Sequence, residues 1–439
     1  MTSEFHRITV GNVAYAVEID PALPLTKDWQ SRLQGACAAH PAALVWDDLV
    51  VKNRRGVRPE AFRLVWPKPD RLFYPQVNHA GRCAVRADLL DDDRPGATSR
   101  ALLKIVDQEQ AVIFSSDILR FTRSLKSPVY KPVAPPPAPS AKAGKISVIV
   151  NYRDQPELME ACLQSLADQR LRSPLEVLLI DNQSTPESLK RIASAAARLL
   201  SAKAEIRHIR YDQPFNKSAQ DNLGVETATG DVTVMMNNDA ALTHPDALQT
   251  ICDWAAMPGV ASAGPLFTGA RGRLVSSGVF IRPPPPNGGQ ALIRENELVT
   301  FASTVHYSAG SSFGCGAMSK AAWATIGPLD TETFRSQYND ADIFIRALRL
   351  GLKHVYVGTV TCHHEPGRSE GRTRERVLDL LRQLMERHPD TASFAGTDPD
   401  LVKNRSLPRF ESARANAWMG VVRKTRQLAH AVRYISGRT

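Results

Sequence analysis

Between residues 146 and 236, short apolar runs alternate with longer segments whose apolar positions recur at helical spacing. The run "ISVIV" (146–150) is rich in β-branched residues and too short for a helix, which indicates a strand buried on both faces. It is followed by the helical pattern "QPELMEACLQSLADQ" and a second apolar run, "LEVLLID". The alternation continues through "SLKRIASAAARLLSA", "AEIRHIRY", "KSAQDNLGVETAT" and "DVTVMM". Repeated strand and helix units predict an α/β fold with a Rossmann-like, mostly parallel sheet and helices on both faces.

Polar residues stand where these predicted strands end. Asn151 and Asp181 close the first two strands, and Asn237, Asn238 and Asp239 follow the strand that ends at "VMM". In open α/β sheets, ligands bind outside the carboxyl ends of the strands. We therefore expect these five side chains to converge on one crevice.

A proline- and alanine-rich stretch, "SPVYKPVAPPPAPSAKAGK", separates this pattern from the preceding chain and is typical of a linker. The sequence thus predicts four parts: a region at residues 1–126, a linker at 127–144, an α/β domain at 145–375 and a helical, basic extension at 376–439. The last part contains apolar positions beside several arginines, a pattern that suits either an anionic membrane surface or docking on its own domain.

Composition narrows the class of protein. The 439 residues are 43% hydrophobic and 23% charged, as in ordinary globular proteins, with no apolar run long enough to span a bilayer and no signal-peptide pattern at the start. We therefore expect a cytoplasmic protein. The formal charge of +10 favours an anionic partner, and six scattered cysteines favour free thiols over a disulfide framework or a zinc site.

A ligand at these strand ends would be bound by side chains, because the turn after the first strand has no glycine-rich pattern that lets the backbone approach a phosphate. The turn after the first strand, "NYRDQPE", lacks the GxGxxG pattern of dinucleotide-binding domains. Asp239 offers the oxygen ligands that suit magnesium or manganese, although a single aspartate in this place is also typical of a turn or a helix cap. Further on, Asp340 and Asp342 begin an amphipathic segment, where Asp342 could simply pair with Arg346.

The order of these motifs resembles family 2 of the inverting nucleotide-sugar glycosyltransferases, which have the GT-A fold, over roughly residues 145–370. The stretches that carry the resemblance are "ISVIVNYRDQPELMEACLQSL", "VLLIDNQSTPES", "FNKSAQDNLGVETATGD", "MMNNDA", "GCGAMSKAAWATIGPLDTETF" and "YNDADIFIRALRLG". "MMNNDA" is similar to the DxD motif with asparagine at its first position, Asn237. "YNDADIF" is similar to the ED motif with Asn339 in place of glutamate.

The resemblance assigns roles to particular residues of this chain. It implies that Asp340 is the catalytic base and that Asp342 supports it. It implies a Mn²⁺ or Mg²⁺ ion held by Asp239 with His363 or His364. The donor-binding residues that it implies are Asn151, Tyr152, Asp181, Asn216, Asn222, Asn237 and Asn238. Because Asp340 and Asp342 both fall near the positive end of a helix, we also expect both pKa values to be lowered.

The activity that the resemblance implies is transfer of a sugar from a nucleotide-sugar donor, UDP- or dTDP-linked, to a glycan or lipid-linked acceptor. The family members that the chain resembles most are rhamnosyltransferases and O-antigen enzymes of bacterial surface polysaccharide synthesis, so a peripheral place at the inner face of the cell membrane is expected. No nucleic-acid partner is expected. Two alternatives are a catalytically silent sugar-nucleotide or glycan-binding module, and a nucleotidyltransferase, for which "NYRDQPE" lacks the glycine-rich phosphate loop.

The first 126 residues resemble a further transferase-like domain found in two-domain rhamnosyltransferases. The pattern R-x-P-x-F-K-P-x-W of its acceptor-side half is approximated by Arg58, Phe62 and Trp66. The stretch that carries this resemblance begins at "ALVWDDLVV", and only about 45 residues precede it, too few for a nucleotide-binding half, so we interpret the region as a truncated, non-catalytic α+β remnant. Asp47 and Asp48 are then interpreted as surface or cap residues rather than a second metal site.

Overall fold

The computed structural model describes residues 4–20, 25–54, 58–64, 81–108, 110–122, 138–269, 274–276, 278–282, 292–295, 303–364, 374–391 and 400–401. The chain forms two compact units, one made of Met1–Pro136 with Thr397–Thr439 and the other of Pro137–Gly396. We call the first the N-terminal unit and the second the transferase unit. The boundary between them falls inside the proline-rich stretch that predicted a linker.

The N-terminal unit is an α+β arrangement around one mixed sheet. Its described strands follow the order β1-β2-β5-β3-β4-β19, and β6 pairs with β3. The strands are β1 (Glu4–Val10), β2 (Val13–Ile19), β3 (Ala43–Arg54), β4 (Arg58–Leu64), β5 (Cys83–Arg86), β6 (Val112–Thr122) and β19 (Asp400–Leu401), and the helices are α1 (Trp29–Ala36), α2 (Ala97–Asp107) and the 3-10 turn η2 (Ala87–Leu89). Trp29 and Leu33 of α1 pack with Trp46 of β3 in its core. The side chains of Asp47 and Asp48 in β3, and Trp66, lie outside the described residues.

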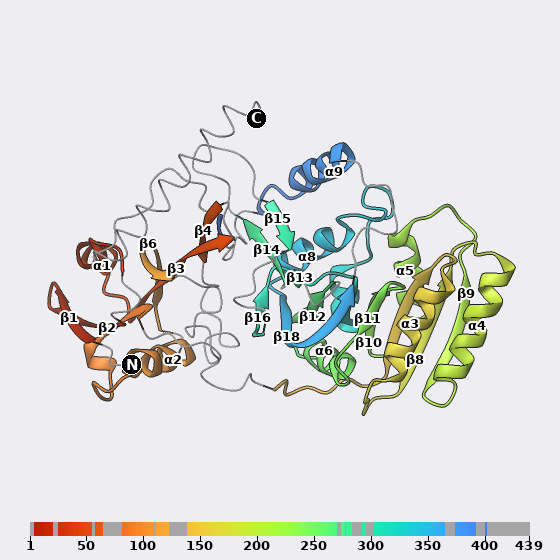
Figure 1. Cartoon of the computed structure of the whole chain (residues 1–439), viewed down its shortest axis with the longest axis horizontal. Coiled ribbons are helices and arrows are strands. Elements are labelled where there is room, and N and C mark those ends of the chain that lie inside the picture. Colours follow the sequence, from red (N-terminus) through yellow and green to blue (C-terminus); the bar gives the residue numbers. More distant parts are fainter. Residues whose placement is uncertain are drawn as a thin grey trace. The chain divides into compact units, whose positions relative to one another are not determined.

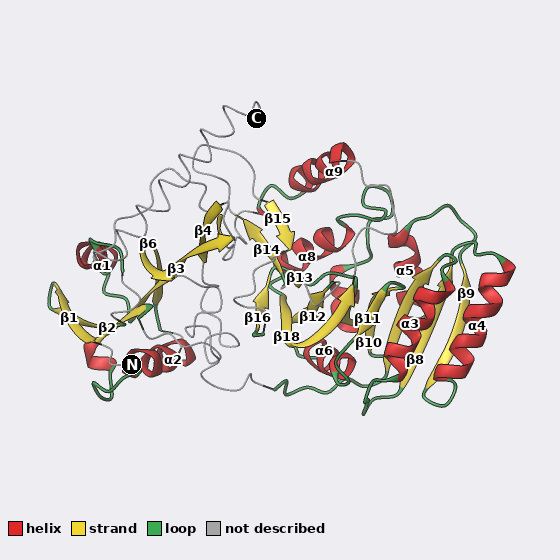
Figure 2. Cartoon of the chain, viewed as in Figure 1, coloured by secondary structure: helices red, strands yellow, loops and turns green. Residues whose placement is uncertain are grey.

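The transferase unit alternates strands and helices as the sequence predicted (Figures 1 and 2). Its helices are α3 (Pro156–Ala167), α4 (Pro186–Leu200), α5 (Lys217–Thr227), α6 (Ala247–Ala255), α7 (Lys320–Ile326), α8 (Asn339–Arg349) and α9 (Arg374–Arg387). Its strands are β7 (Ile146–Tyr152), β8 (Leu175–Asp181), β9 (Ala204–Arg210), β10 (Val232–Asn237), β11 (Ala240–Leu242), β12 (Val260–Thr268), β13 (Leu274–Ser276), β14 (Val279–Arg282), β15 (Leu292–Glu295), β16 (Val305–Ser308), β17 (Cys315–Ser319) and β18 (Lys353–His364).

The large sheet of this unit follows the order β11-β18-β12-β17-β10-β7-β8-β9. Strands β10, β7, β8 and β9 run parallel, whereas β17 runs antiparallel between β10 and β12. Every residue of β8 is buried, as is every residue of β7 except Asn151. Since side chains alternate between the two faces of a strand, both faces are covered, which explains why these strands are apolar runs.

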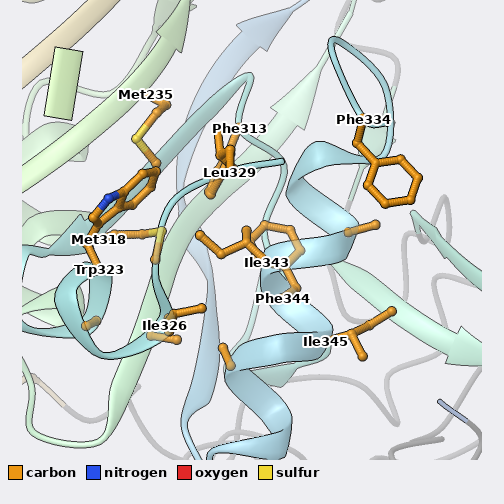
Figure 3. Packing of buried hydrophobic residues seen from close by; sticks show 14 of the residues in the cluster. Met235, Phe313, Met318, Trp323, Ile326, Leu329, Phe334, Ile343, Phe344 and Ile345 are labelled. Atoms are coloured by element: carbon orange, nitrogen blue, oxygen red, sulfur yellow. The ribbon is translucent and has the colours of Figure 1, made fainter. Parts of the chain in front are cut away.

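One core cluster joins the strands to the later helices. Figure 3 shows Met235 and Met318 of two strands beside Trp323 of α7, and Phe344 of α8 belongs to the same cluster. The cluster also contains Leu384 and Met385 of α9. Residues 376–387, which the sequence assigned to the C-terminal extension, therefore belong to the transferase unit. The basic segment 402–439 lies outside the described residues.

The two units share a strand arrangement. In the N-terminal unit β6 runs parallel to β3, and the pairing jumps from Trp46 with Ser115 to Asp47 with Leu119, skipping residues 116–118. In the transferase unit β18 runs parallel to β12 and the pairing jumps in the same way, skipping residues 358–360. In each unit an antiparallel strand, β5 or β17, lies on the other side of the first strand, and a helix precedes the second. The interpretation of the N-terminal unit as a truncated transferase-like remnant stays a prediction.

Gly224 allows α5 to pack closely on the sheet, because a Cβ atom there would lie 2.5 Å from Cγ2 of Ile149. We expect Gly224→Ala to lower the free energy of unfolding by about 1–3 kcal/mol through overpacking. Gly35 of α1 is the matched control, since a Cβ atom there would meet no neighbouring atom within 4 Å, and Gly35→Ala should be neutral or slightly stabilising. Urea denaturation followed by circular dichroism measures both, and equal effects would contradict the close packing of α5.

Candidate functional site

Three buried oxygen atoms without a hydrogen-bond partner lie at the carboxyl ends of neighbouring strands. They are Oδ1 of Asn151 in β7, Oδ2 of Asp181 in β8 and Oδ1 of Asp239 just after β10. The three strands are adjacent in the sheet. A buried polar atom left unpaired costs about 1–3 kcal/mol, so an unpaired group in a native protein requires an explanation. These oxygens mark a place where a ligand can supply hydrogen-bond donors or a cation.

Asp239 lies in the turn between β10 and β11, close to a histidine. Its Oδ1 atom is 3.4 Å from Nε2 of His364, and Nδ2 of Asn237 is 3.2 Å from the same ring nitrogen. The pairing of β11 with β18 sets Ala240 opposite His364 and so brings the two side chains together. Neighbouring residues of a strand point to opposite faces, which directs His363 away from Asp239. Of the two predicted histidines, His364 is the one beside the carboxylate.

We call the cluster of Asn237, Asp239 and His364 the Asp239 corner. Its ligand atoms suit a cation that binds together with a substrate. Asp239 and His364 offer a carboxylate oxygen and an imidazole nitrogen. Within the described part of the chain, no three His, Cys, Asp or Glu side chains converge to hold a metal ion by themselves. Magnesium commonly takes only one or two protein carboxylates and completes its shell with substrate phosphates and water. The residues present therefore fit a substrate-linked divalent ion, although they do not form a closed structural metal site.

A charged pair that the sequence analysis missed lies against Asn151. Asp221 of α5, which is 1% exposed, accepts a hydrogen bond from Nδ2 of Asn151 at 2.5 Å. The Lys217 ammonium donates to the other carboxylate oxygen of Asp221 at 2.7 Å. Lys217 and Asp221 are one helical turn apart, and this spacing is the signal in the sequence that could have identified the pair. The pair places one partly buried cation near the strand ends.

Two of the predicted donor-binding asparagines have their side chains engaged within the protein. Asn216 caps α5 by accepting from the Ala219 amide and donates to the carbonyl of Thr331 at 2.8 Å. Asn222 donates to the carbonyl of Leu329 and accepts from the amide of the same residue. These bonds attach α5 to the segment after α7, and a role in donor binding stays a prediction for both.

Tyr152 and Asn238 complete the predicted donor set. Tyr152 pairs with Asp181 in the register of β7 and β8, and burial raises the pKa of its phenol, with the Asp181 charge adding to the effect. Oδ1 of Asp181 accepts from the Ser184 amide at 3.1 Å, which leaves only Oδ2 unpaired. Asn238 is half-buried in the turn that precedes Asp239.

Asp340 lies in the first turn of α8, and the predicted direction of its pKa shift is wrong. Burial raises the pKa of Asp340 above its ordinary value, despite hydrogen bonds from the amides of Ala341 and Phe313 and the charge of Lys217. The position at a helix N-terminus predicts the opposite shift. Desolvation of the carboxylate outweighs the helix dipole because other segments of the chain pack near this half-buried side chain, and the helical pattern of the sequence does not reveal their packing.

Asp342 is 2% exposed and points into the protein. Arg346 Nε donates to Oδ2 at 2.9 Å, as the sequence predicted, and His388 Nε2 lies 2.9 Å from Oδ1. Burial alone would raise the pKa of Asp342, but the His388 hydrogen bond and the Arg346 charge lower it below its ordinary value. The pKa of Asp342 is lowered as expected, but the main causes are His388 and Arg346 rather than the helix dipole. His388 directly follows the last residue of α9, and the sequence did not predict its contact with Asp342.

Two consecutive residues, Phe313 and Gly314, lie between Asp340 and the Asp239 corner. The backbone amide of Phe313 faces the Asp340 carboxylate and acts to lower its pKa. The next carbonyl, that of Gly314, accepts from the Asn237 amide at 3.0 Å, and a Cβ atom on Gly314 would lie 3.3 Å from Cε1 of His364. The half-buried Asp340 carboxylate and the cluster of Asn237, Asp239 and His364 therefore lie on either side of one short loop.

The transferase unit is similar to known proteins. The segment 147–282, which runs from β7 through β14, matches the family model described as glycosyl transferase family 2. Residues 147–282 form a family 2 glycosyltransferase domain. The predicted resemblance is thereby confirmed, together with the α/β, GT-A fold class of this unit. The matched segment includes Asn151, Asp181 and Asp239, whereas Asp340, Asp342, His363 and His364 lie beyond it.

Curated relatives are longer than this chain. An uncharacterized protein of Sinorhizobium fredii, y4gI, is 25% identical over 276 residues, which is 60% of this chain and 29% of the relative. The O-antigen biosynthesis protein RfbC of Myxococcus xanthus is 30% identical over 139 residues, 31% of this chain and 10% of the relative. The chain thus spans less than a third of either relative. A solved structure of GalNAc-T7 with UDP, GalNAc and Mn²⁺ is similar at 14% identity and a TM-score of 0.44, covering 57% of this chain and 50% of that one.

The Asp239 carboxylate, whose Oδ1 atom accepts no hydrogen bond, predicts the effect of replacing this residue. We expect Asp239→Asn to reduce manganese-dependent nucleotide affinity at least about tenfold, because the amide removes the negative charge that would attract a cation. Isothermal titration of nucleoside diphosphate with and without Mn²⁺ measures this effect. Asp246→Asn is the matched control, since Asp246 pairs with Arg170 at an exposed position. Unchanged affinity in Asp239→Asn would remove this residue from the site.

Proposed function

We propose that this chain is a metal-dependent, inverting glycosyltransferase that moves a sugar from a nucleotide-sugar donor to a hydroxyl group of a glycan or lipid-linked acceptor. The observation that supports this proposal best is the Phe313–Gly314 loop. The loop lies between the half-buried carboxylate of Asp340 on one side and a cluster whose Asp239 Oδ1 atom accepts no hydrogen bond on the other. Sugar transfer needs these two parts together, a proton acceptor and a place for the diphosphate leaving group.

The donor would lie along the strand ends. The unpaired oxygens of Asn151 and Asp181 can accept hydrogen bonds from a nucleoside, and Lys217 offers a cation that can attract its phosphates. Asp239 and His364 would hold Mn²⁺ or Mg²⁺, as the donor set allows. When bound, such an ion neutralises negative charge that builds on the departing nucleoside diphosphate.

Asp340 would act as the general base. Its carboxylate would accept the proton of the acceptor hydroxyl as that oxygen attacks the anomeric carbon, from the face opposite the leaving group, so the configuration inverts. A general base is more effective when its pKa lies closer to the working pH. The raised pKa of Asp340 therefore favours this role, while the amides of Ala341 and Phe313 favour the ionised form.

The biological setting rests on the relatives. RfbC is an O-antigen biosynthesis protein, which supports a role in bacterial surface polysaccharide synthesis. A deoxyhexose donor such as dTDP-rhamnose, or a UDP-sugar, is our choice of donor class. In the described residues, no helix is both long and apolar enough to cross a membrane. Contact of the basic tail with an anionic membrane stays a prediction, as does the non-catalytic role of the N-terminal unit.

Purified full-length protein offered a panel of nucleotide sugars with Mn²⁺ tests the activity. We expect release of the nucleoside diphosphate from one donor class in the presence of a glycan acceptor, and loss of release when EDTA removes the metal. Ion-exchange chromatography of the nucleotides measures the reaction. Donor binding without any release, for every donor and acceptor tried, would favour the silent binding module instead.

Asp340→Asn tests the base. The amide keeps the shape of the side chain but cannot accept the proton, so we expect kcat to fall by about 10²–10⁴. Donor affinity should scarcely change. In the unaltered protein, the rate should fall as acid titrates Asp340, with a midpoint above the ordinary aspartate value near 3.8 because burial raises this pKa. Initial rates as a function of pH measure the midpoint, and a normal kcat in Asp340→Asn would reject the assignment.

A further inference from the structure

The segment between α7 and α8, residues 327–338, is held from two sides. On one side it bonds α5: the Ser218 hydroxyl donates to the carbonyl of Phe334 at 2.5 Å, and the Ser218 amide donates to the carbonyl of Arg335. Asn216 and Asn222 add bonds to Thr331 and Leu329. This side therefore fixes the segment to the helix that carries Lys217 and Asp221.

On the other side the segment meets the end of α9. Arg387 forms an ion pair with Asp330 and donates to Oγ1 of Thr333 at 2.9 Å. Its guanidinium also lies over the Phe334 ring, 4.8 Å from the ring centroid. Phe334 is fully buried and belongs to the same core cluster as α8 (Figure 3). The last residue of α9 thus contacts the segment that α5 holds from the opposite side.

The next residue, His388, reaches the helix that carries Asp340. It is 2% exposed, and its Nε2 atom lies 2.9 Å from Oδ1 of Asp342. Arg346 bonds the other oxygen of Asp342 and donates to the carbonyls of Ile326 and Pro328, both at 2.8 Å. Asp342 therefore connects α9 to α8 and, through Arg346, to the end of α7.

We propose that His388 is a positioning residue for the transfer reaction, acting through Asp342 on the first turn of α8 and so on Asp340. The inference rests on the proposed function, in which Asp340 is the base. Without His388, Oδ1 of Asp342 would keep only the Arg387 guanidinium at 3.7 Å, which is too long for a hydrogen bond, and the side chain would then shift toward water or other donors. Asp342 lies two residues after Asp340, so such a shift would alter the turn that holds the base.

The effect should appear in kcat rather than in donor binding, since His388 contacts neither the strand ends nor the Asp239 corner in the described structure. We expect His388→Leu to lower kcat about tenfold, the size typical of residues that orient a functional group. The donor dissociation constant should stay within about twofold. His388→Gln should retain most of the activity, because its amide can still donate to Asp342. Arg382→Gln, on the exposed side of α9, is the control and should behave as the unaltered protein.

A double-mutant cycle separates positioning from general damage. If His388 acts through Asp340, His388→Leu should cost less than about twofold in the Asp340→Asn background, because the base that it positions is absent. An equal fold-loss in both backgrounds would overturn the proposal, as would equal losses in His388→Leu and His388→Gln.

Hydrogen exchange gives a readout that needs no turnover. We expect faster amide exchange at residues 340–344 in His388→Leu but not in His388→Gln, measured by mass spectrometry on the full chain. Unchanged exchange in His388→Leu would overturn the positioning role. Failure of the proposed function looks different: no donor would be turned over, or Asp340→Asn would be fully active, while the exchange result would still report whether His388 orders the first turn of α8.

Discussion

The transferase unit depends on a sheet whose central strands are buried on both faces. Apolar side chains must fill both sides of β7, β8 and β10, so polar groups can leave the core only where a strand ends. Because the parallel strands end at the same edge, Asn151, Asp181 and Asp239 are gathered there by topology alone. The segment matched to glycosyl transferase family 2 is this same part of the chain.

The features that the sequence predicted are those with a local signal. Strand ends follow from where apolar runs stop, which is why Asp181 and Asp239 could be found without coordinates. The bond between Asp342 and Arg346 followed from helical spacing. By contrast, His388 meets Asp342 across 46 residues of chain, and the Phe313 amide reaches Asp340 from a different loop. Such contacts depend on packing between distant segments, and no periodicity encodes them.

The N-terminal unit has only part of the strand arrangement that gathers Asn151, Asp181 and Asp239 in the transferase unit. It repeats the parallel pair with its skipped residues, β3 with β6, and the antiparallel neighbour β5. In the transferase unit the antiparallel β17 is followed in the sheet by the parallel strands β10, β7 and β8, whereas β5 is followed by β2 and β1, which run antiparallel. Within the described residues, the N-terminal unit has one parallel pair, β3 with β6, whereas the transferase unit has the four parallel strands β10, β7, β8 and β9. A non-catalytic role of the N-terminal unit stays a prediction.

The raised pKa of Asp340 and the lowered pKa of Asp342 arise from the same helix turn, which shows that the helix dipole does not decide either value. Asp342 has three cationic or hydrogen-bonding partners, Arg346, His388 and Arg387, and it can serve as a fixed anchor. Asp340 accepts hydrogen bonds from backbone amides, and these bonds and the charge of Lys217 offset its burial only in part, so its proton affinity is greater. Two carboxylates with different environments can therefore divide the tasks of holding the turn and accepting a proton.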